Sequence, residues 1–284
     1  MKRMKFKMKK IGFIDYYLDE WHANSYPEFI KKAAGDRYEV AYAYAKIDSP
    51  KGGLTTEKWG EKYGIQILDT IEEVIEKSDV LVVLSPDNPE MHEELTDLPL
   101  KSGKLVYIDK TFAPDRAAAE RIFANADAHG TKCYSSSALR FSAELADFDK
   151  EAVKALYTEG SGSYEIYSIH QIEPIVTLMQ KRAKKVMFTG SQEHPAMVIE
   201  FEDGRRAHMH QGYGLPFRIT SVDDKNNANA RVIESDFFGL FIKALIEFYD
   251  TGVVPVPHSQ TVDVIAIREA GLKAIKTPFT WIEV

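Results

Sequence analysis

After Asp79, the stretch Val80-Leu81-Val82-Val83-Leu84 is an unbroken apolar run. Such a run is typical of a parallel strand that other elements cover on both faces. Lys104 to Ile108 repeats the pattern, and Ile11 to Ile14 and Glu39 to Ala45 show it closer to the start. Helix-like stretches separate these runs. Strands that alternate with helices predict an α/β fold that begins with a Rossmann-type, doubly wound parallel sheet.

Three of the intervening helices have clear limits. They are Thr56 to Tyr63, Ile71 to Lys77, and Arg116 to Ala128, and the second has Asp69 or Thr70 as its cap. The helix that follows the first strand is expected to break near Pro27, because a proline ring suits a first turn and disrupts a helix interior.

The alternation of strand-like and helix-like segments ends at about Thr131. Four strand-like segments follow, and Glu202-Asp203-Gly204 is a strong hairpin signal between two of them. Two amphipathic helices, Ser235 to Tyr249 and Ser259 to Lys276, follow the strands. We therefore expect a Rossmann-type, dinucleotide-binding-like domain over residues 1–131. An α+β domain with a mainly antiparallel sheet, for substrate and oligomer contacts, is expected over residues 132–284.

Composition excludes several classes of function. The 284 residues carry a formal net charge of −7, which disfavours nucleic acid as a partner. Cys133 is the lone cysteine, so the chain has no internal disulfide, and a cytoplasmic location is expected. Met1 to Lys10 is predicted to be a solvated basic tail, with the true start left open by three early methionines. The apolar run that follows is too short for a signal core or a membrane span.

Four segments together resemble the Gfo/Idh/MocA family of oxidoreductases. They are Leu84 to His92 (LSPDNPEMH), Tyr107 to Ala113 (YIDKTFA), Ser168 to Glu173 (SIHQIE), and the closing helix pair from Phe237 to Ala274. Members of this family usually oxidise or reduce sugars and related polyols with NAD or NADP. The resemblance spans nearly the whole chain and implies a substrate site in the cleft between two domains.

The resemblance assigns a catalytic role to Lys110, which follows a strand and would contact both nicotinamide and substrate. The alternative is a surface lysine. It also assigns His170 as acid–base machinery, and Glu173, three residues later, would orient the imidazole if both lie on one helix face. A capping or core histidine is the alternative. Arg140 would hold a substrate oxygen with its forked donors, or form a structural salt bridge to the second domain.

Further residues are predicted to contact the cofactor. The resemblance places a group of residues near the nicotinamide, namely Ser85, Pro86, Asn88, His92 and Asp109. Lys46 stands near the end of the second strand, where an acidic residue normally holds the adenine ribose of NAD. A lysine there points weakly to NADP and its 2′-phosphate.

The glycine-rich phosphate loop is missing. In a dinucleotide-binding domain Gly-x-Gly-x-x-Gly lets backbone N–H groups approach the pyrophosphate, and Asp15, Tyr17 and Glu20 occupy these three positions. Two like charges 4 Å apart repel by about 1 kcal/mol in water and by more when shielded from it. Asp15 or Asp19 would alternatively cap the following helix, which also excludes the phosphate.

The same loop is rich in aromatic and titratable groups. Asp15, Tyr16 and Tyr17 are expected to contact a cofactor, and Trp21 and His22 a substrate, although a hydrophobic plug is equally consistent with the pattern. The sequence therefore predicts an NAD(P)-dependent oxidoreductase of a sugar-like or polyol substrate. The alternative is a cofactor-free relative that binds or non-oxidatively converts a small polar ligand.

Partners other than a small molecule are limited. His208 and His210 alternate on one strand and begin a possible zinc site, but no third ligand is visible, so no metal is predicted. The resemblance favours a different use for that sheet, which is pairing into a homodimer or higher homo-oligomer. No membrane partner is expected.

Overall fold

The computed structural model describes residues 8–50 and 52–284, which form two compact units. The first unit comprises the chain up to Ala113 together with Glu120–Ser135 and Ile242–Val256. The second comprises Pro114–Ala119, Ser136–Phe241 and Pro257–Val284. Most of the predicted basic tail lies outside the described residues, but Lys9 and Lys10 belong to the first strand rather than to a tail.

The units are discontinuous, unlike the predicted division at residues 131 and 132. The main reason is helix α7 (Phe237–Thr251), whose second half packs in the first unit. The Tyr249 hydroxyl donates to the backbone oxygen of Leu81 at 2.8 Å, and Asp250 accepts a hydrogen bond from the Tyr38 hydroxyl at 3.0 Å. Long-range contacts of this kind leave no local mark in the sequence.

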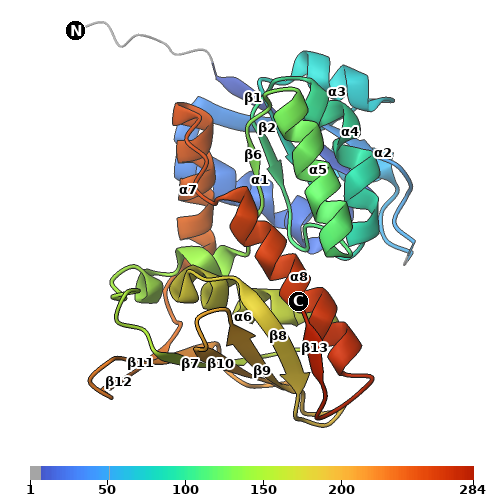
Figure 1. The fold of residues 1–284 in the computed structure, drawn as a ribbon. Coiled ribbons are helices and arrows are strands. Elements are labelled where there is room, and N and C mark those ends of the chain that lie inside the picture. The colour runs from blue at the N-terminus through green and yellow to red at the C-terminus, as the bar shows by residue number, and fades with distance from the viewer. Residues whose placement is uncertain (1–7, 51) are drawn as a thin grey trace, which may run out of the picture. The chain divides into compact units, whose positions relative to one another are not determined.

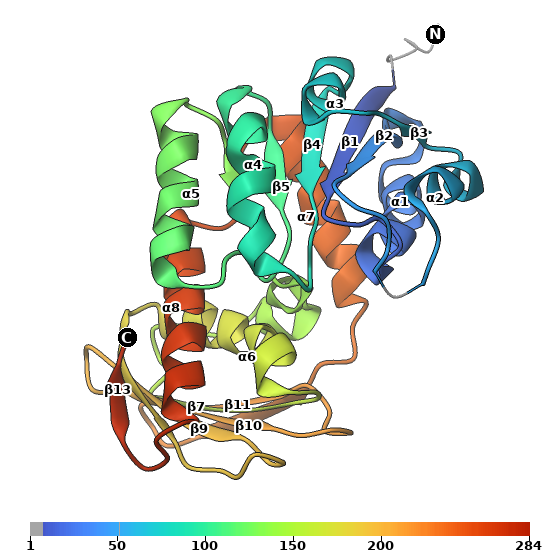
Figure 2. The ribbon, with the colours of Figure 1, turned by 90° about the vertical axis from the view of Figure 1, so that its right-hand side faces the viewer.

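The first unit contains a six-stranded sheet in the order β3-β2-β1-β4-β5-β6, with every neighbouring pair parallel. This confirms the predicted doubly wound sheet. Figure 2 shows α4 and α5 on the near face of the strands and α7 behind them. The strands are β1 (Lys9–Asp15), β2 (Tyr38–Ala45), β3 (Gln66–Ile67), β4 (Val80–Val83), β5 (Val106–Ile108) and β6 (Cys133–Tyr134). The helices are α1 (Trp21–Ala34), α2 (Thr56–Tyr63), α3 (Ile71–Lys77), α4 (His92–Lys101) and α5 (Arg116–Ala128).

Local signals account for several of these helices. The side chain of Thr55 caps α2 and that of Thr70 caps α3, each by accepting from a backbone N–H three residues on. Gly12 in β1 is required by close packing, because a Cβ there would lie 2.5 Å from a methyl carbon of Val74 and 2.3 Å from the Ser78 hydroxyl. Helix α3 can therefore approach β1 closely.

The expected break at Pro27 is wrong, because α1 runs continuously from Trp21 to Ala34. Pro27 removes one intrahelical hydrogen bond at this point. Tyr26 and Ile30 are fully buried on either side of it. Tertiary packing of these large side chains outweighs the local cost of the proline.

The second unit contains a seven-stranded sheet in the order β12-β11-β7-β10-β9-β8-β13. Its pairs are antiparallel except β7 with β10, so the predicted mainly antiparallel sheet is confirmed. The strands are β7 (Ala155–Gly160), β8 (Ala183–Phe188), β9 (Ala196–Phe201), β10 (Arg206–Gln211), β11 (Arg218–Val222), β12 (Ala228–Val232) and β13 (Trp281–Glu283).

Two helices, α6 (Tyr164–Met179) and α8 (His258–Ala274), cover one face of this sheet (Figure 1). Inward side chains such as Leu156, Ile199 and Met209 are fully buried against them. The other face carries half-buried or exposed side chains, including Tyr157 and His208, whose rings stack at 5.0 Å. This alternation is what a sheet with one covered face requires.

Residues 8–50 and 52–284 contain neither a membrane-spanning helix nor a cluster of metal ligands. None of their helices has the length and apolar character needed to cross a membrane. None of their His, Cys, Asp and Glu side chains gather in groups of three that could hold a metal ion.

Candidate functional site

The carboxyl ends of the first unit's parallel strands bring most of the predicted site residues to one edge of the sheet. Asp15 ends β1, Lys46 follows β2, Ser85 follows β4, and Asp109 and Lys110 follow β5. In open α/β sheets, ligands bind at this edge.

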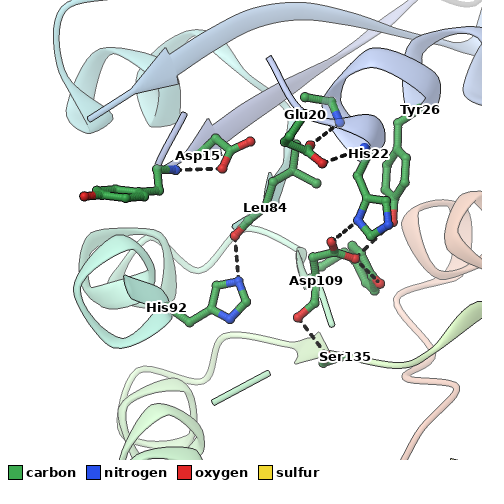
Figure 3. A network of polar contacts seen from close by, with 11 residues as sticks. Asp15, Glu20, His22, Tyr26, Leu84, His92, Asp109 and Ser135 are labelled. Atoms are coloured by element: carbon green, nitrogen blue, oxygen red, sulfur yellow. Dashed lines mark hydrogen bonds and ion pairs between the residues drawn. The ribbon is translucent and has the colours of Figure 1, made fainter. Parts of the chain in front are cut away.

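Glu20 is the last residue of the connection from β1 to α1, and it is the N-cap of the helix. Its carboxylate accepts hydrogen bonds from the backbone N–H of His22 at 2.6 Å and from that of Ala23 (Figure 3). The sequence suggested Asp15 or Asp19 as the cap, whereas the structure shows Glu20 in that position. The helix N-terminus, which binds phosphate in dinucleotide-binding domains, is occupied by the chain's own carboxylate.

Asp15 adds a second carboxyl group to this connection. Its side chain is buried, with one oxygen accepting from the Tyr16 N–H at 2.7 Å. The other oxygen, Oδ2, has no hydrogen-bond partner among the described residues. Burial, and secondarily the charge of Glu20, holds the pKa of Asp15 well above its usual value. Burial likewise raises the pKa of Glu20 to about 7.

The loop after β2 is fastened to the same connection. The N–H groups of Lys46 and Ile47 donate to the backbone oxygens of Asp15 and Tyr16 at 3.1 and 3.0 Å. Asp19 accepts from the N–H of Leu54 at 2.8 Å. Protein hydrogen bonds therefore join the two loops between which the adenosine half of a dinucleotide would bind.

These residues do not fit the pyrophosphate of NAD or NADP in its usual position. No glycine occurs between Asp15 and Glu20, the helix N–H groups are already satisfied, and two carboxyl groups stand where a doubly negative group would have to bind. Lys46, predicted to favour NADP, instead holds Glu94 with nitrogen–oxygen distances of 2.5 and 2.6 Å.

A buried polar network lies beside this connection, centred on the carboxylate of Asp109 (Figure 3). One oxygen accepts from the hydroxyls of Tyr26 at 3.0 Å and Tyr107 at 3.1 Å. The other is bound to Nδ1 of His22. Asp109 is fully buried, and the His22 side chain is 11% exposed. Of the four side chains in this network, the His22 imidazole is therefore the one that reaches the surface.

The charge state of Asp109 follows from its partners. Burial alone would raise its pKa, but the charge and hydrogen bond of His22, helped by Lys110, lower the pKa of Asp109 to about 2. The carboxylate is therefore ionised at neutral pH and holds the imidazole by Nδ1. Asp109 was expected to contact a cofactor, whereas the structure gives it a role in orienting His22.

His92 was expected beside a nicotinamide, but it is fully buried. Its ring nitrogens lie 3.0 Å from the backbone oxygen of Phe112 and 2.6 Å from that of Leu84. Burial lowers the pKa of His92. Its ring joins the segment after β4 to the segment after β5 and offers no atom to a ligand.

The remaining residues of this edge differ in their exposure to solvent. Lys110 is half-buried, and its ammonium has no hydrogen-bond or ion-pair partner in the described chain. Ser85 and Pro86 are buried, and the Ser85 hydroxyl donates to the backbone oxygen of Asn88 at 3.0 Å. Trp21 is 58% exposed at the start of α1. Lys110 and Trp21 are thus the predicted site residues best placed to meet a ligand.

A separate cluster in the second unit contains Arg140 and Glu173. Arg140 Nε donates to the Glu173 carboxylate at 2.5 Å, and Ser136 donates to the same oxygen at 3.1 Å. Arg140 Nη1 donates to Gln260 at 2.7 Å. Of the two roles proposed for Arg140, the salt bridge to the second domain is the one observed.

His170 has a serine as a hydrogen-bond partner in the second unit. Its Nδ1 lies 2.8 Å from the hydroxyl of Ser137, while the Glu173 carboxylate is bound by Arg140 and Ser136. Both residues are on α6, as predicted, but Glu173 is fully enclosed and His170 is half-buried. Phe217 and Tyr167 flank the imidazole with ring centroids 6.0 and 5.6 Å away.

Sequence reasoning missed the partners of the Asp109 network. Tyr26 lies one helical turn after His22 and stacks on its ring at 5.4 Å, so the spacing of four on α1 was an available signal. Tyr107 is in β5 and lies two residues before Asp109, which directly follows that strand, so the extended backbone puts both on the same face. No local pattern pointed to Ser136 or Ser137 as partners of α6.

With this geometry established, the fold identifies a class of proteins. No family model and no curated protein sequence matches the chain. Over its full length, the chain has the fold of the Gfo/Idh/MocA-type dehydrogenases that the sequence motifs indicated.

Three solved structures illustrate the match. A probable dehydrogenase from Thermotoga maritima has a TM-score of 0.79 at 15% identity, covering 96% of this chain and 98% of the other. GenD2 from gentamicin A biosynthesis, solved in complex with NAD, has a TM-score of 0.77 at 11% identity, with coverage of 100% and 99%. A myo-inositol dehydrogenase from Corynebacterium glutamicum has a TM-score of 0.77 at 12% identity, with coverage of 98% and 99%. At these identities the likeness defines the fold alone.

Proposed function

We propose that the chain is a cofactor-free enzyme of this fold, which binds a small sugar-like or polyol ligand and converts it without oxidation. The observation that carries the proposal is the Glu20 carboxylate on the N-terminus of α1, supported by the buried Asp15 beside it. These two acidic residues stand where dinucleotide-binding domains have the glycine-rich loop that binds the pyrophosphate. Because Glu20 already occupies the N–H groups at the start of α1, conventional binding of NAD or NADP is not expected.

The class of ligand follows from the open groups at the edge of the first sheet. Lys110 offers three donors to hydroxyl or carbonyl oxygens, and its ammonium has no partner in the described chain. Trp21 offers an exposed aromatic face on which the C–H groups of a sugar ring can pack. The fold is shared with a myo-inositol dehydrogenase, which favours the same class of ligand.

Titration calorimetry tests this function with NADH, NADPH, myo-inositol and a set of pentoses and hexoses. We expect at least one sugar or polyol to bind, and neither dinucleotide to bind at millimolar concentration. Lys110→Met should weaken the sugar at least about tenfold, as loss of a charge-assisted hydrogen bond does. Lys101→Met, which removes a lysine from a surface ion pair, is the matched control.

A second candidate is an NAD(P)-dependent oxidoreductase of a sugar-like substrate that holds its cofactor in an altered way. The position of Lys110 after β5 favours it, because the resemblance assigns that lysine to both nicotinamide and substrate. Tight NADH or NADPH binding in the same titrations, lost in Lys110→Met and retained in Lys101→Met, would establish this candidate and exclude the first.

We further propose that two copies of the chain pair through the uncovered face of the second unit's sheet. Tyr157 is 47% exposed there and stacks on His208, and Arg206, Glu200 and Lys185 form alternating ion pairs across the same face. Apolar and alternating charged groups suit a self-complementary contact between identical surfaces.

Light scattering coupled to gel filtration measures this pairing. The native protein is expected to be a dimer or a higher oligomer, and Tyr157→Glu should shift it to monomer because an unpaired charge would be buried. Tyr213→Glu introduces the same charge at a residue 83% exposed outside the strands, and should leave the mass unchanged. A native monomer would refute the pairing.

A further inference from the structure

His22 is held in one orientation from several sides. Asp109 binds its Nδ1, Tyr26 stacks on its ring at 5.4 Å, and Trp21 meets the ring edge-on at 5.2 Å. The backbone N–H of His22 is fixed as well, by the capping carboxylate of Glu20 at 2.6 Å. A side chain fixed in this way pays little entropy when it reacts.

The bond to Asp109 determines which ring nitrogen can act as a base. An ionised carboxylate accepts a hydrogen and cannot donate one, so Nδ1 carries the proton. In the neutral form of the ring, Nε2 is then the nitrogen that carries the lone pair. Tyr26 and Tyr107 donate to the other oxygen of Asp109, so the carboxylate cannot rotate to release the imidazole without losing both hydrogen bonds.

One further group contributes to the chemistry at this edge. Lys110 follows Asp109 directly, and its ammonium contributes to the ionised state of that carboxylate. Asp15, at the end of β1, is buried with Oδ2 unpartnered among the described residues. A base and a cation thus belong to one end of the sheet.

We propose that His22 is the catalytic base of an enolisation, with Asp109 as its positioning residue and an open-chain aldose or ketose as the substrate. The role rests on the sugar-like ligand proposed above. His22 lies outside the motifs that the chain shares with the dehydrogenases, in the first turn of α1 and after the positions of the missing glycine-rich loop.

The step is balanced without an external oxidant or reductant. His22 Nε2 takes the proton from carbon 2 of an aldose, and the electron pair of the broken C–H bond forms a double bond between carbons 1 and 2. The carbonyl oxygen on carbon 1 becomes an oxyanion, which the Lys110 ammonium stabilises. The imidazolium then returns a proton to carbon 2, or to carbon 1 with transfer of the hydroxyl proton from oxygen 2 to oxygen 1, which yields the ketose.

Hydrogen exchange with solvent tests the step directly. The protein is incubated in D₂O with each member of a panel of aldoses and ketoses, and proton NMR follows loss of the signals at carbons 1 and 2. Exchange above the rate without enzyme is expected for at least one sugar. His22→Gln should slow it at least about a hundredfold, as removal of a general base does, while calorimetry shows that the sugar still binds.

Two further variants separate catalysis from structure. His129→Gln replaces an exposed histidine near the end of α5 and should retain the native exchange rate. Asp109→Asn should move the pH at which exchange reaches half its maximum rate, because the amide removes the charge that fixes the imidazole, a change that a purely structural loss would not produce. Thermal unfolding confirms that each variant is folded.

The outcomes distinguish this role from the proposed function. A sugar that binds but exchanges no hydrogen with the native protein would overturn the role of His22 and leave the ligand class standing. Unchanged exchange in a folded His22→Gln would also overturn it. Failure of every sugar and polyol to bind would overturn the proposed function itself, and the role of His22 with it.

Discussion

The Glu20→Gln variant is expected to stay stable where the native protein becomes less stable, between about pH 5 and about pH 8. Burial raises the pKa of Glu20 from 4.5 to about 7. The unfolded chain therefore ionises this group first. Its contribution to stability is present in full below about pH 4.5 and is lost as the pH rises through about 7. The shift corresponds to a loss of up to about 3 kcal/mol.

Glutamine mimics the protonated carboxyl group, since it keeps one acceptor for the backbone N–H groups at the start of α1. We expect Glu20→Gln to match the native protein at about pH 5 and to exceed its free energy of unfolding by about 2–3 kcal/mol at about pH 8. Urea unfolding at a series of pH values measures both curves. Groups remote from Glu20 titrate equally in both proteins, so the difference reports Glu20 together with its effect on the pKa of Asp15.

Glu57→Gln is the matched control, because Glu57 is an exposed carboxylate in the first turn of α2. Its curve should run parallel to that of the native protein. If Glu20→Gln also runs parallel, the carboxylate of Glu20 is not buried against the helix N-terminus as described. The N–H groups at the start of α1 would then be available to a phosphate.

The elements that the sequence predicted well are those whose signals are local. Helices α2 and α3 begin and end where the sequence placed them, and Thr55 and Thr70, directly before them, each accept from one N–H group of the first turn. The apolar run before Ser85 is equally local and correctly predicted β4. Strand β7 was missed because Tyr157 and Glu159 interrupt its apolar pattern on the uncovered face.

The contacts that define the candidate site depend on distant pairs and could not be predicted in this way. Asp109 binds residues 83 and 87 positions earlier in the chain, and Arg140 binds a carboxylate 33 positions later. The sequence did predict that an acidic residue would cap the helix after β1, because that inference needs only the residue types in one loop. The identity of the capping residue required the backbone path from β1 to α1.

The interaction of Arg140 with Glu173 should produce the largest loss of stability on substitution. Both side chains are more than nine-tenths buried, because their exposed fractions are 9% for Arg140 and 3% for Glu173. Arg140→Met would leave the Glu173 carboxylate enclosed with only Ser136 as a donor. Removing one partner of a buried ion pair costs about 3–5 kcal/mol, so the free energy of unfolding should fall by that amount.

A double substitution shows whether the cost comes from the stranded charge. In Arg140→Met with Glu173→Gln, the amide oxygen still accepts from Ser136 and no charge remains buried. Most of the lost stability should therefore return, since replacing both members of a buried pair is often close to neutral. Urea unfolding of the two single variants, the double variant and the native protein completes the cycle. If the double variant is as unstable as Arg140→Met, the arginine contributes through the packing of its stem and its bond to Gln260, and the buried charge of Glu173 is not the cause.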